Sequence, residues 1–269
     1  MGNAVVRQVP AVLEPFVGSI AYHENAFAHA RERVLPNGLA QLIVNMREDR
    51  LSAHEDDGTV RHVAGIGLSG VCPAPKVVDP ADQAAVICVA FRPGGAYPFF
   101  AAPQSAAAGQ LVGLDDLWGR AGSRLRERLL DAPTPEERLR LVERALLERA
   151  ADALRPDAAT AYAVAALGRG VPVASVVDRL GRTPRAFIRS FTERVGLPPK
   201  QFARIRRFQR LLASIPHDRP ADWARLAACC GYYDQSHLIR DFRSLAGTTP
   251  ARYRPRNAKE RNHVPLPAD

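Results

Sequence analysis

Two stretches of the C-terminal half, GRTPRAFIRSF (residues 181–191) and GYYDQSHLIRDF (residues 231–242), share one pattern. Each begins with glycine, passes through a short polar segment, and then places an apolar residue, an arginine and a phenylalanine at alternate positions. Aligning Phe191 with Phe242 gives a constant offset of 51 residues. The same offset also pairs Arg189 with Arg240, Gly196 with Gly247, Pro199 with Pro250, and Phe202 with Tyr253. Such self-similarity indicates one supersecondary unit that is built twice.

Each copy has the pattern of two helices joined by a tight turn. In the second copy, apolar residues at i, i+3, i+4 and i+7 precede Gly231, a favourable left-handed C-cap. Asp234 is a good N-cap for the helix that follows. In the first copy the corresponding helix begins at Thr183-Pro184. We therefore predict two helix-turn-helix units, joined by an amphipathic helix from Pro199 to about Ile215.

The predicted joining helix has a length that suits DNA. At 1.5 Å per residue it spans about 25 Å, and B-DNA presents the same groove face about every 34 Å. A rigid helix of this size places two recognition helices in successive turns of the major groove, so that one chain reads one long site with two units.

The charge distribution also predicts a nucleic-acid partner. The chain has a net charge of +9, and residues 157–256 hold 18 Lys and Arg against 7 Asp and Glu. The rest of the chain is therefore close to neutral. An excess confined to one region indicates a polyanionic partner for that region alone, whereas a merely soluble basic surface would not explain the asymmetry.

Residues 157–256 resemble the DNA-binding domain of the AraC/XylS family of bacterial transcription regulators. The resemblance rests on the glycine spacing of the two copies and on the closing GTTPARYR, residues 247–254. It implies a transcription factor that binds promoter or operator duplexes, with RNA polymerase as a further partner if the protein is an activator. Ile188 and Ile239 depart from the polar residues often found in the family, because isoleucine contacts a thymine methyl but reads no hydrogen-bond pattern.

The outer faces of the recognition helices supply the candidate DNA contacts. Arginine matches the edge of guanine and glutamine that of adenine, whereas phosphate contacts set the register without reading sequence. The residues predicted to face bases are Arg185, Ile188, Arg189, Gln235, Ser236, His237, Ile239 and Arg240. Those predicted to contact phosphates are Thr183, Thr192, Arg206 and Arg243. Solvated arginines, or an ion pair of Arg240 with Asp241 or Asp234, remain the alternative.

The N-terminal half is predicted to be β-rich. Apolar runs at residues 39–46 and 84–91 are typical of buried strands, and frequent glycine and proline favour a small barrel or sandwich. The polar segment 48–57 is expected to be a loop or hairpin tip. The predicted fold class is thus α+β, with a β-rich barrel or sandwich and flanking helices followed by an all-α domain.

Two motifs of this half resemble the cupin-like sensor domain found in a subset of the family: RVLPNG (residues 33–38) and FRPGG (residues 91–95). The resemblance implies a small-molecule effector in an interior cleft. Arg92 and Tyr97 are the candidate effector-binding residues. The alternative is that FRPGG is only a turn and that Arg92 is solvated.

The expected domain boundaries follow from these changes of pattern. We predict a β-rich sensing or dimerisation domain with trailing helices (1–133), a connecting amphipathic helix (134–156), a DNA-binding domain (157–256) and a disordered tail (257–269). The amphipathic helix has one apolar stripe, which either connects the domains or pairs with its copy in a homodimer.

Other features exclude several classes. The chain has no apolar run of the roughly 18 residues that a membrane helix needs and no signal-like N-terminus, so we expect a cytoplasmic protein without a membrane partner. The four cysteines have no metal-ligand spacing, and no His-x-His cluster, nucleophile elbow or phosphate loop is present. We therefore expect no cofactor, no metal and no enzymatic activity.

Two further functions stay open. In the first, the front domain binds no effector and serves only for dimerisation. In the second, the protein is an alkyl-acceptor enzyme of DNA repair, some of which fuse this DNA-binding module to a zinc-held cysteine. Only Cys72 and Cys88 lie outside the DNA-binding half, and a stoichiometric zinc ion would favour this alternative.

Overall fold

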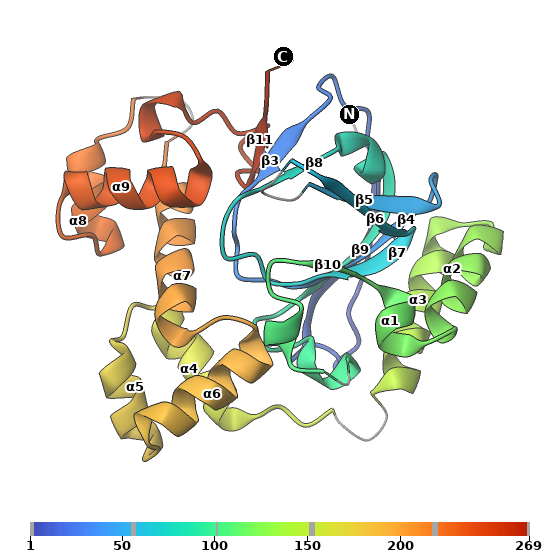
Figure 1. Ribbon diagram of the computed structural model, residues 1–269, viewed down its shortest axis with the longest axis horizontal. Coiled ribbons are helices and arrows are strands. Elements are labelled where there is room, and N and C mark those ends of the chain that lie inside the picture. Colours follow the sequence, from blue (N-terminus) through green and yellow to red (C-terminus); the bar gives the residue numbers. More distant parts are fainter. Residues whose placement is uncertain (1–2, 55–57, 101, 151–153, 217–219, 268–269) are drawn as a thin grey trace.

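The structure is a computed structural model that describes residues 3–54, 58–100, 102–150, 154–216 and 220–267. A β-rich N-terminal part and an all-helical C-terminal part lie side by side, as Figure 1 shows. The α+β fold class predicted from the sequence is therefore confirmed. The predicted domain boundaries remain predictions, and residues 151–153 of the connecting segment lie outside the described ranges.

The strands form three antiparallel sheets. They are β1 (Asn3–Arg7), β2 (Val17–Glu24), β3 (Glu32–Val34), β4 (Gln41–Asn45), β5 (Arg50–His54), β6 (Val60–Ala64), β7 (Ile66–Ser69), β8 (Lys76–Val78), β9 (Ala85–Phe91), β10 (Leu111–Gly113) and β11 (His263–Pro265). The largest sheet has the order β1-β2-β9-β4-β7-β10, and the smaller sheets are β11-β3-β8 and β5-β6. The sheets curve into the barrel-like outline in Figure 1.

The helices flank this barrel on two sides. They are α1 (Leu114–Trp118), α2 (Ala121–Asp131), α3 (Pro135–Arg149), α4 (Ala158–Gly168), α5 (Val173–Leu180), α6 (Pro184–Val195), α7 (Pro199–Ser214), α8 (Trp223–Cys230) and α9 (Gln235–Ala246). Helices α1–α3 cover one flank of the barrel and α4–α9 lie on the other. The core is continuous from the sheet into the helical part.

Alternating apolar residues explain the main sheet. Val89 of β9 pairs with Ile20 of β2 and with Leu42 of β4, and all three side chains are fully buried. The predicted strands at 39–46 and 84–91 are thus confirmed as β4 and β9. The prediction of a loop or hairpin tip over 48–57 is wrong for residues 50–54, because Leu51 and Ala53 of β5 alternate inward and form a small apolar cluster. Residues 55–57 lie outside the described residues.

Helix α3 occupies most of the segment predicted to connect the domains, but its apolar stripe packs within the N-terminal part. Leu139, Val142 and Leu146 are buried, and α3 contacts β1 and β2. Arg7 Nη2 donates a hydrogen bond to Glu143 of this helix at 3.1 Å. Because the stripe is covered by its own chain, it is not free to pair with a second copy.

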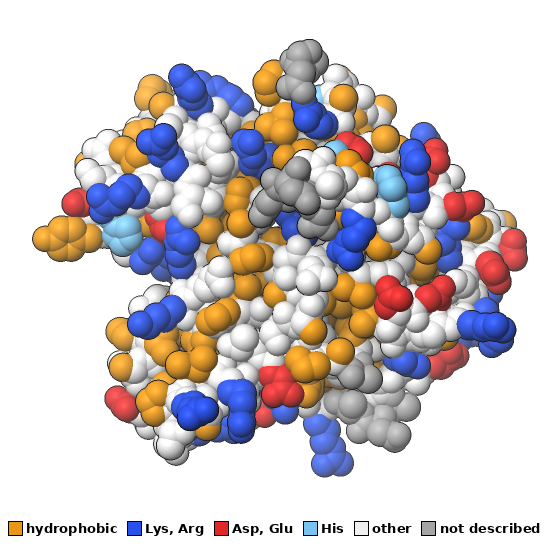
Figure 2. Space-filling model, in the orientation of Figure 1, with side chains coloured by type: hydrophobic (Ala, Val, Ile, Leu, Met, Phe, Trp, Pro, Cys, Tyr) orange, Lys and Arg blue, Asp and Glu red, His pale blue; other side chains and the backbone are white. Residues whose placement is uncertain are grey.

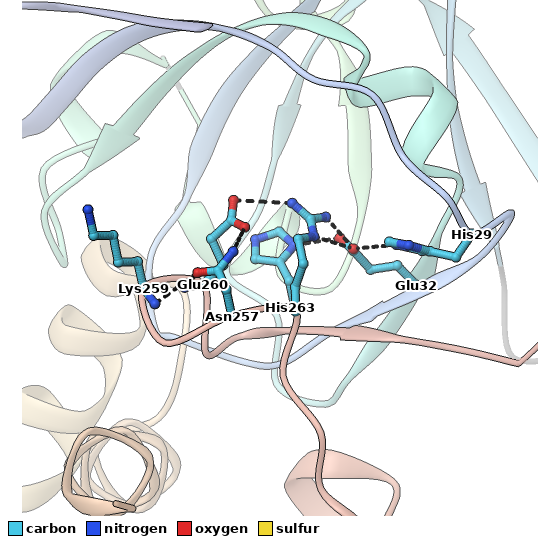
Figure 3. Close-up of polar contacts among 7 residues, drawn as sticks. His29, Glu32, Asn257, Lys259, Glu260 and His263 are labelled. Atoms are coloured by element: carbon cyan, nitrogen blue, oxygen red, sulfur yellow. Dashed lines mark hydrogen bonds and ion pairs between the residues drawn. The ribbon is translucent and has the colours of Figure 1, made fainter. Parts of the chain in front are cut away.

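The prediction of a disordered tail is wrong for the residues described up to Pro267. Strand β11 pairs with the edge of β3, with Val264 opposite Arg33. His263 of the tail and Arg256, directly before it, converge on Glu32 of β3, whose side chain is 0% exposed. Arg256 Nε donates a hydrogen bond to Glu32 at 3.0 Å (Figure 3). His29 Nε2 lies 3.0 Å from the same carboxylate. This buried charge cluster, with an open strand edge, orders the tail.

Candidate nucleic-acid interface

The two helix-turn-helix units are formed by α5–α6 and α8–α9, and local signals fix both. Gly181 ends α5 at φ +61° and Gly231 ends α8 at φ +80°, a left-handed conformation that glycine adopts without steric cost. Thr183 Oγ1 accepts a hydrogen bond from the amide of Ala186, and Asp234 accepts one from that of His237. The turn and the recognition helix of each unit are thus set by residues that the sequence analysis identified.

Helix α7 holds the two recognition helices through aromatic contacts. Phe191 of α6 packs edge-on against Phe202, with ring centroids 5.6 Å apart. Phe242 of α9 packs against Phe208 in the same manner at 5.4 Å. Such contacts are worth about 0.5–1.5 kcal/mol beyond the area that they bury. The units therefore sit at fixed positions near opposite ends of one rod, as Figure 1 shows.

Most of the predicted base-facing residues lie on exposed helix faces. Those with exposed side chains are Arg185, Ile188, Arg189, Gln235, Ser236 and Arg240. Of the predicted phosphate contacts, Thr183 and Arg243 are exposed as well. Within the described ranges, no carboxylate pairs with Arg240, because Asp241 binds other arginines and Asp234 caps its own helix. The exposed arginines are thus available to a ligand.

The remaining predicted contacts lie differently. His237 and Ile239 are half-buried, and Ile239 packs against the core whereas Ile188 is 44% exposed. The hydroxyl of Thr192 is buried without a hydrogen-bond partner among the described residues, so it does not share the exposed face of Thr183, and its contact with a phosphate stays a prediction. Arg206 of α7 is half-buried in a cleft that α4 and the barrel also line, and its contact with a phosphate stays a prediction.

A basic hollow between the units was missed by the sequence analysis. It has a volume of about 740 Å³ and is lined by α7 together with the ends of α4, α5 and α8. Figure 2 shows this edge of the molecule hollowed between two lobes that both carry Lys and Arg side chains. Lys200, Arg204 and Arg207 line it, and in the described part of the chain no acidic residue does. Their spacing along α7 is a signal that could have been read from the sequence.

Two residues next to the second recognition helix were also missed. Tyr233, in the turn before α9, is 93% exposed and projects from the surface. Asp241 is only 5% exposed and accepts hydrogen bonds from Arg204 and from Arg207, the latter at 3.1 Å. Burial, and then the charge of Asp241, raise the pKa of the Tyr232 phenol. The ion pairs fasten α9 to the joining helix.

The candidate effector residues lie outside the barrel interior. Arg92 is exposed, and its Nε donates a 2.7 Å hydrogen bond to the carbonyl oxygen of Glu14. The Tyr97 hydroxyl lies 3.4 Å from Glu193 of α6, and the guanidinium of Arg194 stacks over the Tyr97 ring at 4.7 Å. Tyr97 thus belongs to the contact between the two parts of the chain.

Comparison with known families decides the class of the helical part. A family described as a helix-turn-helix domain matches residues 176–256, which hold α6–α9 and all of α5 except its first three residues. The chain carries an AraC-type DNA-binding domain. The resemblance of this part of the chain to the DNA-binding domain of AraC/XylS regulators is thereby confirmed, and a domain of this class supports DNA binding and the regulation of transcription. Residues 8–113, most of the barrel, match a domain of unknown function.

Solved structures of ToxT from Vibrio cholerae resemble this AraC-type chain weakly. A 1.65 Å structure of ToxT is 11% identical, covers 94% of this chain and 97% of its own, and has a TM-score of 0.39. ToxT bound to an unsaturated fatty acid is 9% identical, with 94% of each chain covered and a TM-score of 0.36. Such scores are too low to transfer any property of ToxT. No curated protein sequence matches the chain.

The described residues hold neither a group of metal ligands nor a membrane-spanning helix. In the part of the chain that the structure describes, no three His, Cys, Asp or Glu side chains are grouped as metal ligands would be. None of the helices within the described ranges combines the length and the apolar character needed to cross a bilayer.

Proposed function

We propose that this AraC-type protein is a sequence-specific regulator whose two units enter successive major-groove turns of one duplex. The observation that carries the proposal is that both exposed recognition faces are fixed to one helix, α7. Its 16 residues span about 24 Å, compared with a groove repeat of about 34 Å. The basic hollow between the units would face the intervening phosphates.

The exposed residues divide into two roles. Arg185 and Arg189 in the first unit, with Gln235 and Arg240 in the second, are proposed to read base edges, where each good pair discriminates by about 1–3 kcal/mol. Thr183, Arg243 and Lys200 are proposed to contact phosphates, and these contacts would weaken as salt rises. Lys200 joins this group because it lines the hollow and is exposed.

The N-terminal part is proposed to modulate DNA binding through a small molecule. An effector acts only if its affinity differs between conformations that differ in DNA-site geometry. The runner-up is an effector-free regulator with a dimerisation-only front domain, and the buried stripe of α3 works against dimerisation through that helix. Contact with RNA polymerase would follow if the protein activates transcription.

The cysteines work against the DNA-repair alternative. An alkyl acceptor needs a reactive thiolate, which requires a lowered pKa. Burial instead raises the pKa of Cys88 to about 12 and also raises that of Cys72. Neither thiol is ionised at neutral pH.

The test is selection of bound duplexes from a random pool, together with gel shifts on the DNA upstream of its own gene. We expect a two-part site, with each part lost separately in Arg185→Ala and Gln235→Ala. Arg128→Ala on α2, which is also exposed, is the matched control and should bind like the wild type.

The spacing of the two parts gives the sharper result. Because α7 is rigid, inserting about 5 or about 10 base pairs between them should abolish joint binding, although the longer insertion restores the helical phase. Binding that survives the full-turn insertion, or a selection that yields no preferred sequence, would reject the proposal.

A further inference from the structure

A cleft of about 590 Å³ separates the barrel from the helical part on the side of α4. Its barrel wall is formed by the ends of β2 and β9 with Leu39 and Phe91, and its other wall by α4 and α7. Val164 of α4 faces the same space. The volume falls within the range of small-molecule sites, and these apolar side chains resemble the linings of such sites.

Three arginines line this cleft, and they come from both parts of the chain. Arg92 follows β9, Arg169 follows α4, and Arg206 lies in the middle of α7. Among the lining residues that the structure describes there is no aspartate or glutamate. Within the described ranges, none of the three guanidinium groups forms an ion pair, and the Nε of Arg92 binds only a backbone carbonyl. The cleft therefore concentrates positive charge without a counter-charge.

Of the three arginines, Arg206 is the one for which the lack of a counter-charge is least favourable. Its side chain is half-buried beside Gly168, where a Cβ would lie 4.0 Å from Arg206 Nε. Burial, and then the charge of Arg210, lower the pKa of Arg206. Arg210 already donates to the carbonyl oxygen of Gly168. Buried charges are normally paired, so an anion at this position would supply the missing partner.

We propose that this cleft binds a small organic anion that carries more than one negative charge, as phosphate esters and polycarboxylates do. A single carboxylate would leave two of the three guanidinium groups uncompensated, whereas a multiply charged oxyanion accepts charge-assisted hydrogen bonds from all three. The apolar walls would contact its carbon skeleton.

The site has a consequence for regulation that rests on the proposed DNA-binding function. Arg92 belongs to the barrel, whereas Arg169 and Arg206 belong to the helical part. An anion held by all three favours the conformation in which the two parts lie together. Arg206 also belongs to α7, which holds both recognition helices. The ligand would therefore contact the helix that sets the distance between them.

The experiment is calorimetric titration of the full chain, without DNA, using inorganic pyrophosphate and citrate as probes. We expect one site per chain, at least a tenfold loss of affinity in Arg206→Gln and in Arg169→Gln, and a smaller loss in Arg206→Lys, which keeps the charge. Arg128→Gln on α2 removes the same charge from an exposed position and should leave the affinity unchanged. Circular dichroism and melting curves verify that each variant is folded.

Several results would overturn the proposal. The first is that neither probe binds at concentrations up to about 10 mM. The second is that Arg206→Gln and Arg128→Gln lose equal affinity. The third is that the monocarboxylate octanoate binds more tightly than both probes. Displacement of the probe by a random duplex, with duplex binding itself weakened by Arg206→Gln, would make the cleft a DNA-backbone contact instead. Because the titration contains no DNA, a chain that binds the probe but no preferred duplex rejects only the proposed function.

Discussion

The two helix-turn-helix units have the same local design but are held in place by different contacts. In both, glycine ends the first helix, a capping side chain starts the second, and a phenylalanine of the recognition helix packs on α7. Beyond that shared set the surroundings diverge. An internal repeat thus specifies the unit, while the rest of the chain determines what each unit is coupled to.

The first unit packs directly against the barrel. Helix α6 packs against the 3-10 turn Gln104–Ala106, and Gly196 at its end lies where a Cβ would be 3.3 Å from the carbonyl oxygen of Gln104. Tyr97 adds a hydrogen bond to Glu193 and a stacking contact with Arg194. A conformational change in this part of the barrel would therefore act directly on α6, the first recognition helix.

The second unit is anchored through charges instead. Asp241 of α9 binds Arg204 and Arg207 of α7, whereas Ser190 occupies the equivalent position in the first unit. The chain that follows α9 returns to the barrel, where Arg256 and His263 surround Glu32. The comparison predicts that removing these charges affects the second unit and spares the first.

The largest expected effect is at Glu32. Burial opposes its ionisation, but hydrogen bonds from His263 and Arg256 lower its pKa to about 2, compared with an ordinary value of 4.5. A depressed carboxyl pKa contributes stability that is fully present above the ordinary value and is lost as the pH falls through the folded one. We expect Glu32→Gln to cost about 3 kcal/mol at pH 7 and to flatten the loss of stability between pH 4.5 and pH 2.

Urea denaturation across this pH range measures the Glu32 contribution. The exposed Glu136→Gln on α3 is the control and should behave like the wild type. Hydrogen exchange should show faster opening of β11 and α9 in Glu32→Gln, with α6 unchanged. Equal acceleration in α6 and α9 would mean that the tail stabilises the whole chain and does not couple the second unit alone.

The next effect is at Asp241. Its removal leaves two partly exposed arginines without their carboxylate, and loss of one partner of a buried pair is strongly destabilising. Because the arginines reach solvent, we expect Asp241→Ala to cost about 2 kcal/mol, measured by urea denaturation, and to weaken DNA contacts of the second unit first. Ser190→Ala in the first unit is the matched control, and a similar loss there would contradict the comparison.

The features that the sequence predicted are those with local causes. Gly181 and Gly231 end α5 and α8, capping side chains start α6 and α9, and an apolar stripe predicts α7. Mostly apolar runs predict β4 and β9. The tail strand β11 was missed because its three residues have no periodicity and its partner β3 lies far away in the chain. The burial of Glu32 and of the Thr192 hydroxyl depends on packing between segments that are distant in the chain. Sequence spacing does not predict such packing.

One arginine of each recognition helix extends the comparison of the two units to DNA binding. Arg189 and Arg240 occupy equivalent positions of the repeat and are both exposed. We expect each alanine substitution to weaken binding to the selected duplex by about 1–2 kcal/mol and to relax sequence preference in its own half of the site. Fluorescence anisotropy measures the affinity, and repeated selection measures the preference. Loss of affinity without relaxed preference would assign that arginine to a phosphate.

The smallest effect tests whether the two turns are interchangeable. Gly181 and Gly231 both have left-handed backbone angles, and at each of them an added Cβ would meet nothing within 4 Å. The cost of alanine is therefore only that of holding an L-residue in this conformation, about 1 kcal/mol at either site. Equal losses of unfolding free energy in Gly181→Ala and Gly231→Ala would place the asymmetry of the two units entirely in their tertiary supports. A clearly larger loss at Gly231 would mean that the turn of the second unit has a constraint that the first lacks, since open space excludes a steric cause.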